Sequence, residues 1–311
     1  MTIESLSRKR TIAYLDILGF HEFTIQSIED PYLISKLEQA MRDAFSWLGG
    51  PESLQAPIDS DWSLRVFSDC VCVTNEMTDI GVGSMIIGLA LFQREMLKSG
   101  FLIRGAITLG SYYQSDYAII SDGLVKAHKI ESEDAIYPRI IIEEEVLDLI
   151  KDINDLDLRF MIEEYIAIDI DKKSFILYLV FDDEDSWPEA NNFLYYQKSI
   201  IIEGLSKQYP DNIKIKYQWL GEMHNWALSI ISEIIKQTGL LTEDDVWSFF
   251  DLIVKECQES RGIKSMLWAD KDYQEYYPKR TTNGLNQERI DWIRQWPGSE
   301  KYLNQSEGDW D

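Results

Sequence analysis

The chain has 311 residues, of which 45% are hydrophobic and 27% charged, so it can bury a large core and has the composition of a soluble globular protein. Its formal charge of −24 repels phosphate backbones and argues against nucleic acid as a partner. The sequence shows neither a signal-peptide pattern nor an apolar run long enough to cross a bilayer. We therefore expect a cytoplasmic protein that does not bind membranes.

Strand and helix patterns alternate along the first half of the chain. Ser68-Asp69 divides two short apolar runs, which predicts a hairpin with an aspartate at its tip. The element order predicts an α+β fold, a mostly antiparallel sheet with covering helices. The predicted strands are residues 11–18, 64–67, 70–74, 101–109, 117–120 and 138–142, and the predicted helices are 28–47, 80–98, 123–133 and 143–151.

The second half of the chain is less regular. Its patterns predict a strand at 175–181 and helices at 191–208, 220–238 and 243–257, followed from about residue 266 by an extended arm that mixes tryptophan with charged residues. We expect one domain at residues 1–150. Residues 151–311 would form a mainly helical C-terminal α/β extension and arm, packed on that domain or on a dimer partner.

Two aspartates interrupt apolar strand patterns. Asp16 lies inside TIAYLDILGF, where a charge costs several kcal/mol unless it is paired or binds a metal, although it could also cap the following turn. Asp69 lies at the hairpin tip, where aspartate is also a common turn residue. Together, two aspartates at neighbouring strand ends, one beside a Gly-Phe turn, could hold two divalent cations and a triphosphate.

These segments carry a family resemblance. AYLDILGFHEF resembles the first metal-binding motif of class III nucleotidyl cyclases, and RVFSDCVCV resembles the second. FLIRGAITLG and SDGLVKAHKIES continue the similarity through the helix that supplies transition-state residues in that family. Within the family, GLVKAHKIESEDAIYPRI and KYQWLGEMHN are most similar to the bacterial pyrimidine cyclases of the Pycsar antiphage system. The resemblance covers residues 11–145 and one short motif beyond them.

The resemblance implies a two-metal site. Asp16, Asp69 and the carbonyl group of Ile17 would bind two Mg²⁺ or Mn²⁺ ions. One ion would lower the pKa of the ribose 3′-hydroxyl for attack on the α-phosphorus, and the other would neutralise the triphosphate and the leaving pyrophosphate. Such a reaction requires no nucleophilic side chain.

The resemblance also implies phosphate contacts. The amides of Leu18, Gly19 and Phe20 would cradle the triphosphate, and Arg104 matches an arginine of the family that contacts phosphate. Each of these groups offers N–H donors to phosphate oxygens.

Lys129 falls where the family often places an arginine that stabilises the transition state. The family position usually filled by asparagine is Val125 here, so this chain departs from the pattern. In the family, metal ligands and transition-state residues come from different subunits. The resemblance therefore implies a homodimer with two shared sites.

Two positions bear on the base. Purine cyclases of the family carry lysine or glutamate four residues before the hairpin aspartate and aspartate or cysteine on the later strand, and here the matching residues are Arg65 and Ala118. Arginine could donate to the carbonyl oxygen shared by uracil and cytosine, whereas alanine cannot accept from adenine. We expect a pyrimidine nucleotide cyclase that acts on UTP in preference to CTP, within a bacterial antiphage system.

Other functions stay open from the sequence alone. A purine cyclase, a non-catalytic nucleotide-binding module favoured by Val125, and an interaction protein that uses its Trp-rich arm are the alternatives. Asp169 and Asp171 could form a second metal pair, although their spacing before a Lys-Lys turn is more typical of an exposed hairpin end. The three histidines lack the spacing of a helical zinc site.

Overall fold

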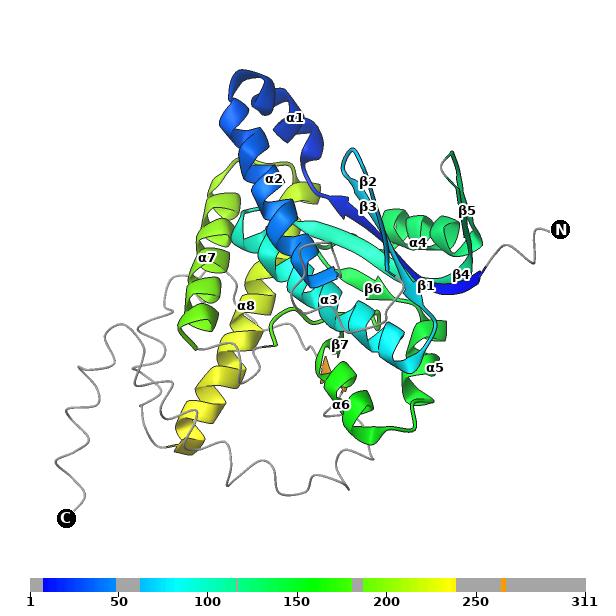
Figure 1. Ribbon diagram of the computed structural model, residues 1–311. Coiled ribbons are helices and arrows are strands. Elements are labelled where there is room, and N and C mark those ends of the chain that lie inside the picture. Colours follow the sequence, from blue (N-terminus) through cyan, green and yellow to red (C-terminus); the bar gives the residue numbers. More distant parts are fainter. Residues whose placement is uncertain (1–7, 49–61, 116, 181–186, 239–263, 267–311) are drawn as a thin grey trace, which may run out of the picture. The chain divides into compact units, whose positions relative to one another are not determined.

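The computed structural model of the chain describes residues 8–48, 62–115, 117–180, 187–238 and 264–266 (Figure 1). The chain divides into two compact units. The first contains the residues up to Tyr178 together with 264–267, and the second contains the remainder. The predicted loop at 49–61, the predicted helix at 243–257 and nearly all of the predicted arm lie outside the described residues.

The first unit is built around a nine-stranded mixed sheet. Its strands follow the order β2-β3-β1-β4-β6-β8-β7-β9, and β5 pairs with β4. The strands are β1 (Arg8–Ile17), β2 (Ser63–Phe67), β3 (Cys70–Glu76), β4 (Ile103–Gln114), β5 (Ile119–Ser121), β6 (Ile140–Ile142), β7 (Ile166–Ile168), β8 (Ser174–Ile176) and β9 (Lys264–Ser265). The helices are α1 (Phe20–Glu29), α2 (Pro31–Phe45), α3 (Asp79–Lys98), α4 (Asp122–Glu133), α5 (Glu144–Lys151) and α6 (Leu156–Glu164), with a 3₁₀ turn at Ser46–Leu48.

The first four long strands form a βαββαβ arrangement. β1 pairs antiparallel with both β3 and β4, and β2 pairs antiparallel with β3, which gives the order β2-β3-β1-β4. This is the split βαβ arrangement of ferredoxin-like folds. β6 extends the sheet by pairing in parallel with β4. The predicted α+β class and the mostly antiparallel sheet are confirmed at this level.

Side chains of β1 alternate between two helical layers. Thr11, Ala13 and Leu15 are buried on one face, whereas Ile12 on the other face packs near Leu124 of α4. α4 approaches β4 closely, because a Cβ atom at Gly110 would lie 2.4 Å from the backbone of Gly123. Glycines at this contact therefore allow α4 to lie directly against the strands that carry the candidate site.

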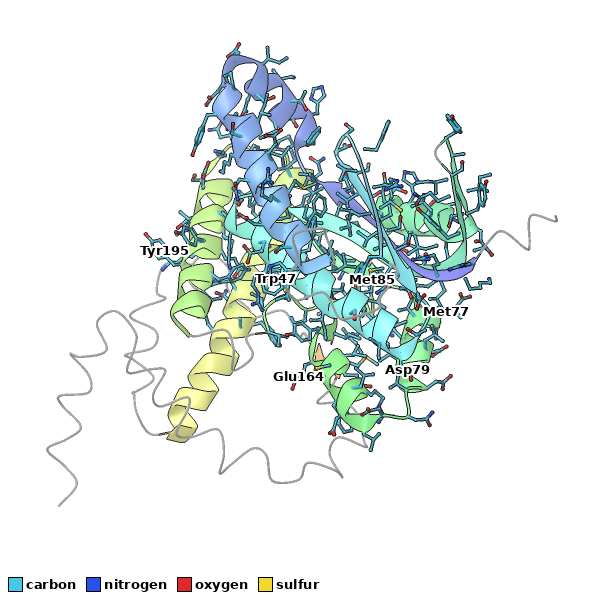
Figure 2. The ribbon with its side chains drawn as sticks, viewed as in Figure 1. Trp47, Met77, Asp79, Met85, Glu164 and Tyr195 are labelled. Atoms are coloured by element: carbon cyan, nitrogen blue, oxygen red, sulfur yellow. The ribbon has the colours of Figure 1, made fainter. Side chains whose placement is uncertain are left out.

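Helix α3 is the most apolar helix described. Thr78 caps it by accepting from the Gly81 N–H at 3.0 Å, and Figure 2 labels Asp79 at its start and Met85 further along. α3 meets the length and composition of a membrane span, but 72% of that window is buried within the protein. Met85 is fully buried, so α3 is a core helix of this unit.

The predicted helix at 28–47 is wrong in its boundaries. The structure instead places α1 and α2 on either side of Asp30, which has an extended backbone and accepts from the Tyr32 N–H at 3.1 Å. Pro31 at the first position of α2 lacks an N–H group, so the preceding helix cannot continue through it. The predicted strand at 175–181 is also shorter, since β8 ends at Ile176.

The first unit extends beyond residue 150. Helix α6 and strands β7 and β8 follow α5 and add to the sheet, so the compact unit runs to Tyr178. The side chain of Arg139 has no exposed surface and forms ion pairs with Asp169 and Asp171. These two aspartates therefore neutralise a buried arginine in this structure, which accounts for their spacing without a second metal pair.

The second unit contains a helical hairpin of α7 (Trp187–Ser206) and α8 (Asp211–Thr238), which correspond to the predicted helices at 191–208 and 220–238. His224 is buried, and its Nδ1 atom lies 2.9 Å from Gln197 Oε1. Burial lowers the pKa of His224 to about 3, so the ring is neutral at physiological pH.

Candidate metal and nucleotide site

The structure brings Asp16 and Asp69 together. Asp16 lies near the end of β1, opposite Cys70 on β3, and Asp69 occupies the turn between β2 and β3. The Ile17 N–H donates to the Asp69 carbonyl oxygen at 3.0 Å, which joins the strand end to the turn. One carboxylate oxygen of each aspartate and Cys70 Sγ all lie within 4.8 Å of one another. This group could hold a metal ion.

The donor chemistry fits a hard divalent cation. Two half-buried carboxylates provide hard oxygen ligands. Burial raises the pKa of the Cys70 thiol to about 11, although a hydrogen bond with Tyr14 opposes that shift. A thiol is a weak ligand while it keeps its proton, so the carboxylates define the preference.

Cys70 belongs to a small cluster beside the aspartates. Tyr14 Oη lies 2.7 Å from Cys70 Sγ. The ring of His128, on α4, meets the Tyr14 ring edge-on at 5.1 Å between centroids. Burial raises the pKa of Tyr14, so its hydroxyl stays protonated. The sequence analysis did not identify Cys70 as a site residue, because only the pairing of β1 with β3 places its thiol beside Asp16.

Arg104 bridges two carboxylates. Its Nε atom lies 3.0 Å from Asp16 Oδ2 and 2.7 Å from Glu131 Oε1. The sequence analysis linked Arg104 to phosphate, whereas in this structure its Nε lies beside protein carboxylates. Arg104 therefore connects strand β1, which carries the candidate metal ligand Asp16, to helix α4.

Glu131 is a site residue that the sequence analysis missed. Its side chain is only 4% exposed. Burial raises the pKa of Glu131, Arg104 opposes the shift and Asp16 adds to it. The available signal was its place on the buried stripe of α4, four residues after Ala127 and eight after Gly123.

The turn after β1 presents backbone donors. Gly19 has a left-handed backbone, φ 79° and ψ 13°, and precedes α1 without a side-chain cap. The Phe23 N–H makes the first helical bond, to the Gly19 carbonyl, so the amide of Phe20 precedes the helical ladder and faces the end of the helix where anions bind. The Leu18 N–H, by contrast, donates to the Leu102 carbonyl at 2.9 Å and is therefore used within the fold.

Lys129 lies on another side of α4. Its side chain is 69% exposed, and its Nζ atom lies 4.0 Å from Glu133 Oε2. Two residues along a helix correspond to about 200°, so Lys129 points away from buried Glu131. Val125 is also exposed, at 70%. The structure therefore does not place Lys129 with Asp16 and Asp69 of the same protomer.

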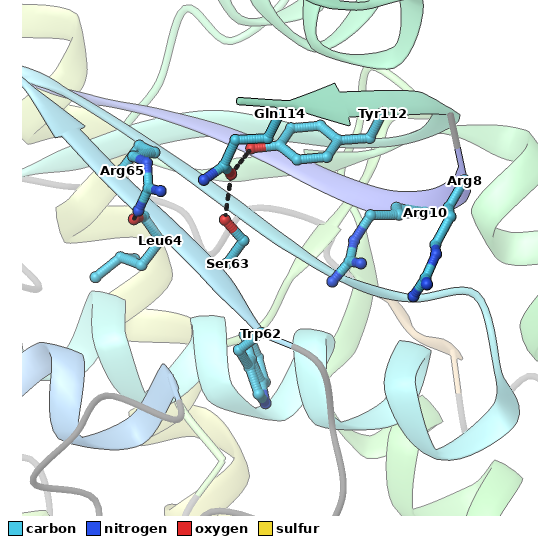
Figure 3. A pocket seen from close by; sticks show the side chains of 8 residues that line it. All are labelled: Arg8, Arg10, Trp62, Ser63, Leu64, Arg65, Tyr112 and Gln114. Carbon is cyan, nitrogen blue, oxygen red and sulfur yellow. Dashed lines mark hydrogen bonds between the residues drawn. The ribbon is translucent and has the colours of Figure 1, made fainter. Parts of the chain in front are cut away.

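Arg65 contributes to a pocket of about 440 Å³ (Figure 3). Arg65 is exposed, and its Nη1 atom donates to the Leu64 carbonyl at 2.9 Å. Ala118 does not line the pocket, because it lies at the β4–β5 turn, where its carbonyl accepts from the Ser115 N–H. The described residues that line the pocket are Arg8, Arg10, Trp62, Ser63, Leu64, Arg65, Tyr112 and Gln114.

The polar wall of this pocket was not predicted. Ser63 Oγ and Tyr112 Oη each donate to Gln114 Oε1 at 2.8 Å. Burial raises the pKa of Tyr112, so the phenol remains a donor at neutral pH. Ser63 and Gln114 are 51 positions apart, and no local pattern links them.

No protein-family model matches the chain, and no curated protein matches it closely enough to indicate a family.

Proposed function

We propose that the first unit is a metal-dependent pyrimidine nucleotide cyclase that converts UTP (or CTP) to the 3′,5′-cyclic mononucleotide and pyrophosphate. The observation that carries the proposal is the Asp16–Asp69 pair at adjacent strand ends, beside the left-handed turn and the uncapped start of α1. This arrangement places carboxylates for divalent cations next to backbone donors for a triphosphate. The product would be a cytoplasmic second messenger in bacterial antiphage defence.

Asp16 and Asp69 would hold two Mn²⁺ or Mg²⁺ ions, which acidify the ribose 3′-hydroxyl and neutralise the triphosphate. The ribose 3′-hydroxyl would release its proton to solvent, its oxygen would form a bond to the α-phosphorus, and the bond from that phosphorus to the bridging oxygen would break to release pyrophosphate. The Phe20 amide at the start of α1 binds phosphate oxygens. Arg104 stays anchored by Glu131 when Asp16 binds a cation, and its other N–H groups then face the developing charge.

A second copy of the chain would complete each site. Lys129 is exposed and lies about 200° around α4 from buried Glu131, so we assign it to phosphate bound by a partner. Phe67 and Val125 are 81% and 70% exposed, and such apolar side chains would gain from burial between two protomers. We therefore place the two protomers face to face, with Lys129 of each near the metal ligands of the other.

The proposal is tested by product formation. Purified protein is incubated with Mn²⁺ and each of the four ribonucleoside triphosphates, and cyclic product and pyrophosphate are measured by mass spectrometry. We expect cyclic UMP or cyclic CMP from the wild type and none from Asp16→Asn. Asp43→Asn changes an exposed carboxylate of α2 in the same way and serves as the matched control. A preference for ATP or GTP would favour a purine cyclase, and nucleotide binding without product would favour a non-catalytic module.

A further inference from the structure

The side chain of Gln114 is held in one orientation by two hydroxyl groups. Ser63 Oγ and Tyr112 Oη both donate to Gln114 Oε1, each at 2.8 Å, and Figure 3 shows the three side chains joined in this way. A carboxamide oxygen has two lone pairs, so these two bonds occupy both of them. The Nε2 amino group, on the other side of the planar amide, is left with N–H groups to donate.

The charged side chains of the same pocket are also donors. Arg65, Arg8 and Arg10 line it, and a guanidinium group has N–H donors and no acceptor. Arg65 gives one of its five N–H groups to the Leu64 carbonyl. Among the described residues, no carboxylate lines the pocket. Arg65 and the Gln114 amino group therefore favour a ligand whose edge carries carbonyl oxygens.

The two pyrimidine bases differ at that edge. Uracil carries carbonyl oxygens at positions 2 and 4, whereas cytosine carries a carbonyl oxygen at position 2 and an amino group at position 4. Arg65 can donate to the position-2 oxygen of either base. The Gln114 amino group can donate to the position-4 oxygen of uracil. At the same position cytosine presents an amino group, which is also a donor, so no hydrogen bond can form between them.

We propose that Gln114, oriented by Ser63 and Tyr112, selects uracil over cytosine, so that the substrate is UTP. This inference rests on the proposed nucleotide site. It assigns base specificity to the side-chain amide of Gln114 in addition to Arg65. Ser63 is a positioning residue, because it acts on the base only through Gln114.

The test is a competition between the two substrates. Equimolar UTP and CTP are incubated with the full chain and Mn²⁺, and the ratio of cyclic UMP to cyclic CMP gives the ratio of their kcat/KM values. We expect the wild type to favour UTP by at least about tenfold, since a donor left facing a donor in a pocket is unfavourable. Gln114→Glu should lower the ratio at least about tenfold, because a carboxylate accepts from the cytosine amino group and repels the uracil oxygen.

Two further variants complete the test. Ser63→Ala frees the amide from one of its two hydroxyl groups and should lower the ratio in the same direction by less. Gln208→Glu makes the same charge change at an exposed position of the second unit and should leave the ratio unchanged. Thermal melting verifies that each variant is folded, and Ser63→Ala decides the outcome if Gln114→Glu does not fold. A wild-type preference for CTP, or an unchanged ratio in the folded pocket variants, would overturn the inference.

Binding separates this inference from the proposed cyclase activity. The affinities of α,β-methylene UTP and α,β-methylene CTP are measured by calorimetry in the presence of Mn²⁺. Tighter binding of the UTP analogue, reversed in Gln114→Glu, would support uracil selection even if no cyclic product forms. Equal binding of the two analogues by a protein that does produce cyclic nucleotides would reject uracil selection and leave the cyclase proposal standing.

Discussion

Glu131→Gln is the most informative single change near the proposed metal ligands. Arg104 lies between Glu131 and Asp16, at 2.7 and 3.0 Å. In the metal-free protein the variant still leaves Arg104 paired with Asp16. When Asp16 binds a cation, the variant leaves Arg104 with only a neutral amide. The substitution should therefore destabilise the metal-bound form more than the metal-free form and weaken Mn²⁺ binding.

The magnitude follows from the ion pair that is lost. An exposed ion pair contributes about 0.2–1 kcal/mol and breaking a fully buried one costs about 3–5 kcal/mol. This pair joins a buried carboxylate to a partly exposed arginine, so the metal-bound form loses about 1 to 1.5 kcal/mol. Since about 1.4 kcal/mol corresponds to tenfold, the dissociation constant for Mn²⁺ should rise about 5- to 12-fold. The loss of a negative charge near the ion acts in the same direction.

Electron paramagnetic resonance titration of free Mn²⁺ at pH 7 measures this constant directly. Glu133→Gln is the matched control, because it lies on the same helix with its carboxylate exposed beside Lys129, and it should leave Mn²⁺ affinity unchanged. Unchanged or tighter Mn²⁺ binding in a folded Glu131→Gln protein would refute the idea that Glu131 anchors Arg104 beside the ion.

Three further predictions concern the dimer, the core and the base. Mixing inactive Asp69→Asn with inactive Lys129→Ala protomers should restore roughly a quarter of wild-type activity, because about half of the dimers are mixed and each has one intact site; no recovery despite verified subunit exchange would place each site within one chain or remove Lys129 from it. Asp169→Asn should lower the free energy of unfolding by about 3–5 kcal/mol in urea titrations, since it leaves buried Arg139 partly uncompensated; a loss below about 1 kcal/mol would show that Asp171 alone neutralises the arginine. Arg65→Ala should lower the turnover of pyrimidine relative to purine triphosphates by about 5- to 150-fold through loss of a contact worth about 1–3 kcal/mol, and an unchanged ratio would move base recognition elsewhere.

Much of the sheet could be predicted because its signals are local. The apolar pattern of β1 and the Ser68-Asp69 break between β2 and β3 can both be recognised in short stretches of sequence. The same signals predicted that Asp16 and Asp69 meet. One lies at a strand end and the other at a hairpin tip, and both positions can be located from short stretches of sequence. The division between α1 and α2 could also have been predicted, because Asp30-Pro31 is a helix-capping and helix-breaking pair.

The missed residues depend on contacts between distant segments. Glu131 looks like one charge among many on a helix, and only its ion pair with Arg104, 27 positions earlier, shows that it belongs to the site. The proposed role of Gln114 becomes apparent only from the hydrogen bonds by which Ser63 and Tyr112 orient its amide. Such roles follow from the register of non-neighbouring elements, which periodicity and composition do not specify.

The measurement that tests the central claim most directly is cyclic nucleotide formation by the wild type and by Asp16→Asn and Asp69→Asn in the presence of Mn²⁺. We predict that the wild type releases a cyclic pyrimidine mononucleotide and pyrophosphate in equal amounts. Both variants should stay folded by circular dichroism, since loss of one carboxylate leaves the strands intact, and should form no product. Near-wild-type product formation by either folded variant, or no product from any of the four triphosphates with the wild type, would contradict the account.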